Sequence, residues 1–352
     1  MIGPLYDRGY FMSLVYSGSF LVVFGTMMQS LCSQYWQLML SQGITVGIGT
    51  GVIYVPSLAV VSEAFTRKRA IAIGVPSTGA GIGTHVSLSD DITLLTIEVI
   101  GGIIYPIAFR KLQPMVGFEW ATRIIGFIFL GTFAISYLSF HGISLVGTKP
   151  RAMIDRTAFR ETPFMVYVLA LVLIGCGYFV PIFYISVDAT TNLDISPDLA
   201  FYLLSILNAA SVIGRFLPGL VPKVFAAMAA FPLLTAAGGL VVFAWMAVHN
   251  LAGLVVFGAI YGIIAGYLIT VITIMVPVLS PPGAIHETIG TRIGMAWFGF
   301  GIGGLIGSPI GGALSDTKTG NFKGAQAFGG ATLFGGAALL IYPWMVVRRR
   351  RA

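Results

Sequence analysis

The sequence has few charged residues and almost no cysteine. Only 9% of its 352 residues are charged, whereas 57% are hydrophobic. A soluble domain carries about 25% charged residues, which it needs to cover its apolar interior in water. The two cysteines, Cys32 and Cys176, offer neither a disulfide framework nor the spacing of a metal site. These shortages exclude a soluble enzyme, a disordered chain and a nucleic-acid-binding domain.

Catalytic constellations are also missing from the apolar stretches. Asp and Glu are nearly absent from these stretches outside residues 84–100, and the four histidines are scattered. Hydrolytic or metal chemistry needs several such groups close together. We therefore expect no enzyme activity, no cofactor and no metal.

Long apolar runs dominate what is present. A helix that crosses a bilayer needs about 20 mostly apolar residues. Ten runs meet this requirement, namely 10–32, 36–62, 70–109 (interrupted), 118–146, 164–187, 199–221, 226–247, 251–279, 291–314 and 326–347. The sequence predicts an all-α, multi-pass integral membrane protein whose first partner is the lipid bilayer.

The positive charges gather in alternate loops. Fifteen of the 20 Lys and Arg residues fall in one alternating set of joints between runs, and the other five fall in the second set. Cytosolic loops carry the excess of Lys and Arg. Both termini are therefore predicted to face the cytosol, which requires an even number of spans.

Residues 84–100 interrupt the third run. They place two aspartates near mid-span, where each buried carboxylate costs several kcal/mol. Without them, 79–83 joins 101–107 as GAGIGGGIIYPI, which matches GFGIGGLIGSPI at 299–310 in eight of twelve positions. Such an internal repeat is typical of transporters. We predict that 84–100 is an inserted segment; the alternative is a genuine loop between two half-helices.

Three stretches carry a family resemblance. GPLYDRG at 3–9 resembles the loop between the second and third spans of the major facilitator superfamily. FTRKRAIAIG at 65–74, continuing to Gly79 and Gly83, resembles the fifth-span signature of monocarboxylate transporter-like proteins, especially fungal ones. LLSILNAASVIGRFLPG at 203–219 resembles the eighth span of that family. The resemblance implies a major facilitator fold of twelve spans.

About ten of those twelve spans are seen, four in the first half and six in the second. The implied organisation is an N-terminal transmembrane half at 1–146, which lacks the first two spans and carries the apparent insertion. A cytosolic inter-half loop follows at 147–163, then a six-helix half at 164–347 and a basic cytosolic tail at 348–352.

The function that the resemblance implies is secondary transport of a small organic solute by alternating access. The solute would be a carboxylate or a secondary metabolite, and the direction would be efflux. The alternatives are proton-coupled monocarboxylate uptake, and a truncated remnant or sensor that does not transport. The expected setting is the plasma membrane, with the chain as a monomer and an anionic solute as its small-molecule partner.

Arg215 is the main candidate for substrate binding. It lies about 24 Å into a span that begins near Leu199, and the family has a carboxylate-binding arginine here. A guanidinium holds a carboxylate by two parallel hydrogen bonds; the alternative is an arginine that reaches the membrane surface. Ser211 and Asn208 share its helix face and are predicted to bind substrate with it, or else to pack helices. Proton-coupled relatives have an aspartate in place of Ser211, so the serine argues against proton symport.

A conformational latch is predicted at the cytosolic side. Charges at a helix contact can pair in one access state and separate in the other; ordinary positive-inside topology is the alternative. The glycine-rich stretches 74–83 and 294–312 are predicted to let helices approach closely and slide. The gating candidates are Asp7, Arg8, Arg67, Arg69, Gly74, Gly79 and Gly83.

Overall fold

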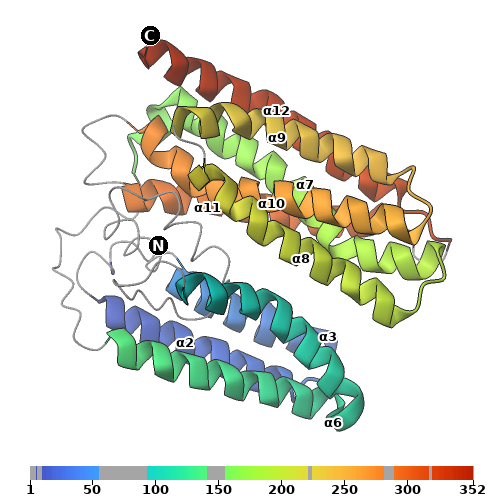
Figure 1. Ribbon diagram of the computed structural model, residues 1–352. Coiled ribbons are helices and arrows are strands. Elements are labelled where there is room, and N and C mark those ends of the chain that lie inside the picture. Colours follow the sequence, from blue (N-terminus) through green and yellow to red (C-terminus); the bar gives the residue numbers. More distant parts are fainter. Residues whose placement is uncertain are drawn as a thin grey trace. The chain divides into compact units, whose positions relative to one another are not determined.

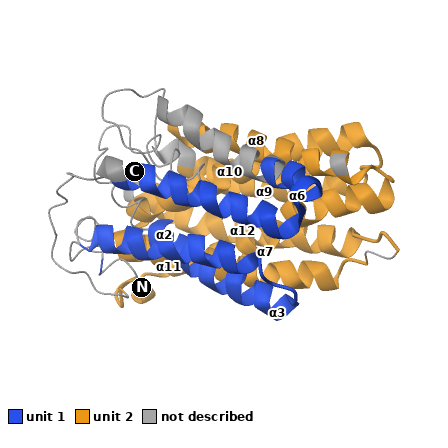
Figure 2. Ribbon diagram, turned by 90° about the horizontal axis from the view of Figure 1, so that it is seen from below, with its two compact units in different colours: residues 1–153 blue, residues 154–352 orange. Residues whose placement is uncertain are grey.

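The computed structural model describes residues 5, 10–54, 93–140, 155–220, 224–280, 289–316 and 319–351. Within these ranges the regular elements are helices, and one isolated β-bridge joins Asp316 to Asn321. The chain separates into two compact units, Met1–Met153 and Ile154–Ala352, which Figure 2 colours separately. The division between them lies in the segment where the sequence places the inter-half loop.

The apolar runs form helices because a helix satisfies its own backbone N–H and C=O groups, which lipid cannot do. Eight helical stretches in the described part of the chain have the length and hydropathy to cross a membrane. They are Phe11–Gln29, Ala108–Ile135, Thr162–Asn192, Leu199–Leu220, Met228–Trp245, Leu251–Leu279, Ile289–Ala313 and Lys323–Arg349. The predicted all-α membrane architecture is therefore confirmed.

The described part of unit 1 contains four elements (Figure 1). They are α2 (Phe11–Gln29), α3 (Tyr35–Leu38), the π-helical η1 (Met39–Val46) and α6 (Thr93–Phe140). The backbone stays helical from η1 to Tyr54, so the second predicted run changes its winding partway along. Glycines bring this run close to α2, since a Cβ on Gly18 would lie 2.6 Å from Cγ1 of Ile53. Small residues thus hold the two helices together, as in other membrane bundles.

Helix α6 consists of two arms joined at Gly117. This glycine has φ 78° and ψ 167°, a backbone conformation that ends one helix before the next begins. The stretch Ala108–Ile135 has the composition of a single span, but the break at Gly117 divides it. The second arm thus starts where the predicted run 118–146 starts, and residues 93–100 of the predicted insertion form the first turns of the other arm.

In the part of unit 2 that the structure describes, the short 3₁₀ helix η2 (Ala158–Arg160) precedes a bundle of six α-helices (Figure 1). They are α7 (Thr162–Asn192), α8 (Pro197–Leu220), α9 (Val224–Trp245), α10 (Leu251–Leu279), α11 (Ile289–Ala313) and α12 (Lys323–Arg351). Their bounds agree with the predicted runs to within five residues. Helix α10 is the most enclosed, with 78% of its apolar window buried, so it forms the centre of the unit.

Glycines set the closest helix contacts in unit 2. A Cβ on Gly299 would lie 2.8 Å from Cγ1 of Val168, and a Cβ on Gly303 would collide with the backbone of Val172. Gly307 meets Cys176 in the same way, so α11 packs on α7 through a glycine at every fourth position. This supports the packing interpretation of the stretch 294–312. The other glycine-rich stretch, 74–83, lies outside the described residues.

Candidate functional site

Arg215 lies in the last two turns of α8, at the position where the sequence predicts an anion-binding arginine. Its Nε and Nη1 atoms are buried, and within the described structure they have no hydrogen-bond partner. Its charge acts on the phenol of Tyr178 in α7. An arginine has five N–H donors and stays charged, so a guanidinium with buried, unsatisfied donors is suited to bind an anion.

Tyr178, the phenol on which the charge of Arg215 acts, packs among other aromatic side chains. The ring centroid of Tyr178 lies 5.3 Å from that of Phe300 in α11 and 5.0 Å from that of Phe179. Tyr261 of α10 donates a hydrogen bond from its hydroxyl to the backbone oxygen of Tyr178 over 2.7 Å. Rings of this kind keep water away, and a charge–charge contact is stronger where water is scarce.

Ser211 and Asn208 lie on the same helix as Arg215. Unlike Nε and Nη1 of Arg215, the Ser211 hydroxyl has a hydrogen-bond partner. The Ser211 hydroxyl donates to the backbone oxygen of Asn208 over 2.7 Å, and the residue is 5% exposed. A Cβ on Gly266 of α10 would collide with the backbone oxygen of Ser211. The backbone of Ser211 thus packs against α10, and a role of its side chain in substrate binding stays a prediction. Asn208 is half-buried on the same face.

A second arginine, Arg292, is paired with carboxylates. It lies in the first turn of α11 and is 1% exposed. Its Nε donates to Oδ2 of Asp155 over 2.8 Å, while Nη1 and Nη2 donate to the two carboxylate oxygens of Glu161 over 2.7 and 2.6 Å. Its guanidinium also lies 5.4 Å from the ring centroid of Phe164. This Arg292 cluster (Asp155, Glu161 and Arg292) ties the segment before α7 to the start of α11.

Asp155 is held in its ionised form. Burial of its carboxyl opposes ionisation, but hydrogen bonds from Thr157 and Arg292 outweigh that effect, so the pKa of Asp155 is lower than usual. The backbone N–H of Thr157 donates to Oδ1 of Asp155 over 2.9 Å, and the Thr157 hydroxyl donates to the same oxygen. The ion pair therefore remains formed throughout the physiological pH range.

Sequence reasoning missed the Arg292 cluster. Arg292 entered only as one positive charge in the orientation argument, and its two partners were not singled out. The available signal was weak: Asp155 and Glu161 are two of only 13 acidic residues in the chain, and they stand among arginines. The residues that pair are 137 and 131 positions apart, so no local spacing could have joined them.

A buried carboxylate also lies at the other end of α7. Asp188 is 6% exposed and accepts hydrogen bonds from Nδ2 of Asn192 over 2.6 Å and from Nε1 of Trp245 over 2.9 Å. Asn192 donates in addition to the backbone oxygen of Gly320 over 2.8 Å. These bonds fasten the end of α7 to α9 and to the loop before α12. The Asp188 carboxylate thus accepts hydrogen bonds from neutral donors, whereas the carboxylates of Asp155 and Glu161 accept from the charged Arg292.

The predicted latch residues and their glycines lie outside the described residues. They are Asp7, Arg8, Arg67, Arg69, Gly74, Gly79 and Gly83. In the part of the chain that the structure does describe, no group of three or more His, Cys, Asp and Glu side chains could hold a metal ion. Within unit 2 the functional candidates are therefore the unpartnered Arg215 and the paired Arg292.

Comparisons with known proteins agree with this helical architecture. No family model matches the chain. A variant of the E. coli fucose:proton symporter FucP superposes on it with a TM-score of 0.67 and 12% identity, over 97% of this chain and 87% of that chain. At that identity the likeness establishes the fold alone.

Two fungal proteins are similar in sequence. The MFS-type transporter dbaD of Emericella nidulans is 35% identical over 331 residues, covering 93% of this chain and 69% of that protein. The aspyridones efflux protein apdF of the same organism is 31% identical over 328 residues, covering 93% of this chain and 62% of that protein. The chain belongs to the major facilitator superfamily of membrane transporters.

Proposed function

We propose that this chain exports a small organic anion, a carboxylate or a carboxylate-bearing secondary metabolite, by alternating access. The support comes from the family and from the site together. Relatives include a protein named for aspyridones efflux. Unit 2 holds an arginine whose charge acts on Tyr178, and the Tyr178 ring packs against Phe300. Within the superfamily we assign the chain to the monocarboxylate transporter-like group, on the resemblance of 65–74 and 203–219.

The observation that carries the proposal is the state of Arg215. A buried charge without a partner is costly, because it has lost water and gained nothing in exchange. Its Nε and Nη1 donors are unsatisfied within the described residues. A carboxylate that bound there would accept both donors and neutralise the charge. The unsatisfied donors cost free energy in the empty site, and the relief of that cost would contribute to binding.

Arg215 therefore acts as the anion anchor in this proposal. Asn208 lies about two turns before it and supplies an amide to a polar part of the solute. Ser211 lies one turn before Arg215, and its hydroxyl would contact the solute beside the carboxylate. Because serine cannot carry a proton at this position, export of an anion fits the site better than proton-coupled uptake does.

The setting of the protein follows from the distribution of charge and from the family. We infer that both termini face the cytosol, that the membrane is the plasma membrane and that the working unit is a monomer. Asp7, Arg8, Arg67 and Arg69 would form a latch that opens and closes with the access state. The glycines at 74, 79 and 83 would let the corresponding helices slide.

The transport proposal is tested in vesicles that contain the purified full chain. Radiolabelled benzoate and lactate serve as probe anions, and benzyl alcohol serves as the neutral counterpart of benzoate. We expect Arg215→Gln to reduce benzoate flux about 100-fold and Arg215→Lys to retain part of it, because lysine keeps the charge without the paired donors. Arg156→Gln, at an exposed arginine in the loop before α7, is the matched control.

Two results would contradict the proposal. One is an Arg215→Gln protein that folds and carries benzoate at the wild-type rate. The other is benzyl alcohol flux that, after subtraction of the flux into protein-free vesicles, equals the benzoate flux corrected in the same way. A flux that follows an imposed pH gradient would favour the uptake alternative. The predicted insertion at 84–100 is tested separately, by sequencing the spliced transcript through codon 101.

A further inference from the structure

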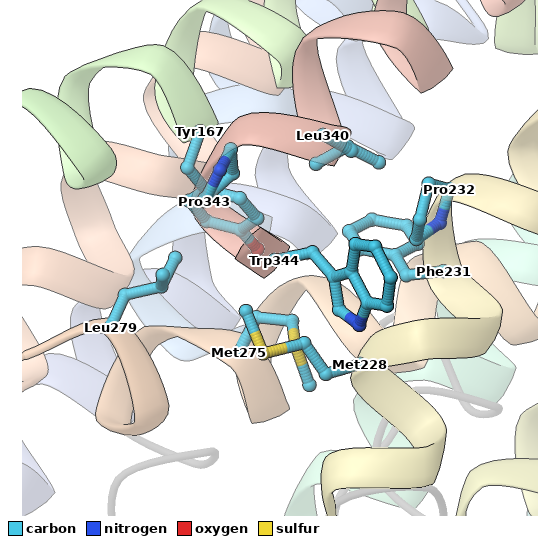
Figure 3. Close-up of a pocket in the computed structure, with 9 residues that line it drawn as sticks. All are labelled: Tyr167, Met228, Phe231, Pro232, Met275, Leu279, Leu340, Pro343 and Trp344. Carbon is cyan, nitrogen blue, oxygen red and sulfur yellow. The ribbon is translucent and has the colours of Figure 1, made fainter. Parts of the chain in front are cut away.

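Three side chains in the described part of unit 2 have buried polar atoms without a hydrogen-bond partner, namely Ser205, Arg215 and Trp344. Trp344 lines a crevice between α7, α9, α10 and α12 (Figure 3). The crevice leaves about 10 Å³ for a water-sized molecule, which is room for roughly one water, so no solute enters it. Ser205 and Arg215 lie together on α8, and Ser205 has no role in the proposed function.

The hydroxyl of Ser205 behaves differently from other hydroxyls in the helices of unit 2. A serine or threonine inside a helix commonly donates to the backbone oxygen one turn earlier. Thr235 of α9 donates to Phe231 over 2.7 Å, and Ser308 of α11 donates to Gly304 over 2.8 Å. Oγ of Ser205 makes no such bond within the described residues, although the atom is buried. A buried hydroxyl without a partner is unfavourable, and a bound molecule would supply the partner.

Ser205 shares a face of α8 with the predicted anion anchor. Ser205, Asn208 and Arg215 are separated by three and by seven residues, which places them along one side of a helix. Val212 falls on the same side, between the amide and the guanidinium. This polar face of α8 (Ser205, Asn208, Val212 and Arg215) thus has a hydroxyl and an amide at one end, an apolar side chain in the middle and a cation at the other end.

The rest of α8 is apolar and serves other contacts. Leu203 and Leu207 are buried, and their backbone oxygens meet glycines of α10. Tyr202, Ile213 and Leu220 are exposed, and in a membrane-spanning helix such side chains meet lipid. The polar face of α8 is therefore separate from the side that packs on α10 and from the exposed side. Polar side chains in membrane helices turn away from lipid and mark the path of a solute.

The two unsatisfied groups are far apart along the helix. Ten positions separate Ser205 from Arg215, which corresponds to about 15 Å along the axis. Side chains lean toward the N-terminus of their helix, and the long Arg215 side chain leans further than that of Ser205, so their polar atoms are roughly 10–12 Å apart. One small group such as a carboxylate cannot contact both of them.

We propose that the solute carries a second polar oxygen, roughly 10–12 Å from its carboxylate, and that Ser205 binds this oxygen. The inference rests on the proposed function, in which Arg215 holds the carboxylate. A serine hydroxyl both donates and accepts, so it binds a hydroxyl or a carbonyl oxygen. Asn208, one turn from Ser205, adds an amide at the same end.

The substrate class is then an elongated, oxygenated organic acid. In a short acid such as lactate the polar groups are too close together to reach both ends of the polar face of α8. A long acid without a distal oxygen would reach Ser205 but would leave its buried hydroxyl unsatisfied. Loss of a hydrogen bond to such a buried group is what allows a site to reject a close analogue.

The test measures binding of two matched acids to the purified full chain in nanodiscs by isothermal titration calorimetry at pH 7. The probes are 4′-hydroxybiphenyl-4-carboxylate and biphenyl-4-carboxylate, rigid acids that differ only in the hydroxyl at the far end. Titration into empty nanodiscs corrects for partition into lipid. We expect the hydroxylated acid to bind the wild type about five-fold more tightly. Ser205→Ala should abolish this preference by weakening the hydroxylated acid alone.

The matched control is Ser308→Ala, which removes a half-buried hydroxyl that already has a partner and should retain the five-fold preference. Arg215→Gln separates this inference from the proposed function, because it should weaken both acids by the same factor. If it left both affinities unchanged, the anion anchor would fail and the Ser205 contact would stand.

Two results would overturn the inference and leave the carboxylate site in place. The first is equal binding of the two acids by the wild type. The second is a preference for the hydroxylated acid that persists in Ser205→Ala. If the wild type bound neither acid, the proposed function and the inference would both fail. Ser205→Ala keeps Cβ and removes only an unsatisfied hydroxyl, so the variant should fold as the wild type does.

Discussion

Arg215 and Arg292 lie in the same six-helix unit, but only one of them has carboxylate partners. Arg292 is 1% exposed and its donors reach Asp155 and Glu161. Arg215 has two buried donors without a partner in the part of unit 2 that the structure describes. A charge that its own protein satisfies stabilises a particular arrangement of helices. A charge that is left unsatisfied lowers stability and keeps its binding capacity for a ligand.

The largest effect should come from removing the paired arginine. Arg292→Met leaves the carboxylates of Asp155 and Glu161 without their cation, and breaking a buried ion pair in this way costs about 3–5 kcal/mol. We expect the thermal midpoint of the purified protein, measured by fluorescence-detected size exclusion, to fall sharply. Adding Asp155→Asn and Glu161→Gln to the same variant should recover part of the loss. A midpoint that stays at the wild-type value would mean that the cluster contributes little to the fold.

The same substitution at the unpaired arginine should act in the opposite direction. Arg215→Met removes a half-buried charge whose Nε and Nη1 have no partner among the described residues, so we expect the empty protein to be unchanged or stabilised by about 1–2 kcal/mol. Addition of benzoate should raise the thermal midpoint of the wild type and leave that of Arg215→Met unchanged. If Arg215→Met were as unstable as Arg292→Met, Arg215 would have a structural partner after all.

Substitution of a glycine tests whether helix spacing positions Arg215. A Cβ on Gly266 would collide with the backbone oxygen of Ser211, so Gly266→Ala should force α8 away from α10 and cost about 1–3 kcal/mol. The measurement is again the thermal midpoint, with and without benzoate. Gly294→Ala is the control, because a Cβ at Gly294 meets no atom within 4 Å. Equal stability of the two variants would contradict the close contact of α8 and α10.

Acidification should give the smallest effect and should reach only the paired arginine. Because the folded-state pKa of Asp155 is lower than usual, its contribution to stability is complete above its ordinary pKa of about 4 and is lost as pH falls through the folded pKa. We expect the thermal midpoint to decrease below about pH 4 in the wild type. The decrease should be smaller in Asp155→Asn, and Arg215→Met should retain the wild-type profile. An identical acid profile in Asp155→Asn would remove Asp155 from the explanation.

The helices could be predicted from the sequence because each coincides with a long apolar run. The run 251–279 became α10 with the same bounds, since Asn250 caps its start by accepting from the backbone N–H of Gly253 over 2.7 Å. The break at Gly117 was predicted only as the end of a run. The reversal of φ at that residue depends on the tertiary arrangement of α6. Local chemistry therefore accounts for the elements better than for their joints.

The two arginines were not equally predictable. Arg215 stands out in an apolar run, so its position alone marks it as a candidate site. That its donors lack a partner depends on which side chains of other helices meet it, which spacing along α8 does not report. Arg292 stands beside a loop and looks like an ordinary topology signal. Its importance appears only when the fold brings Asp155 and Glu161 to it.

The glycine contacts in unit 2 also determine which glycine positions tolerate substitution. Every amino acid that a single base change can introduce at a glycine codon carries a Cβ atom. At Gly214, Gly262 and Gly266 that atom would collide with the backbone of the facing helix, whereas at Gly294 and Gly301 it meets nothing within 4 Å. In a library of random variants the first three positions should therefore tolerate almost no change, whatever solute is selected for, and the last two should accept small uncharged side chains.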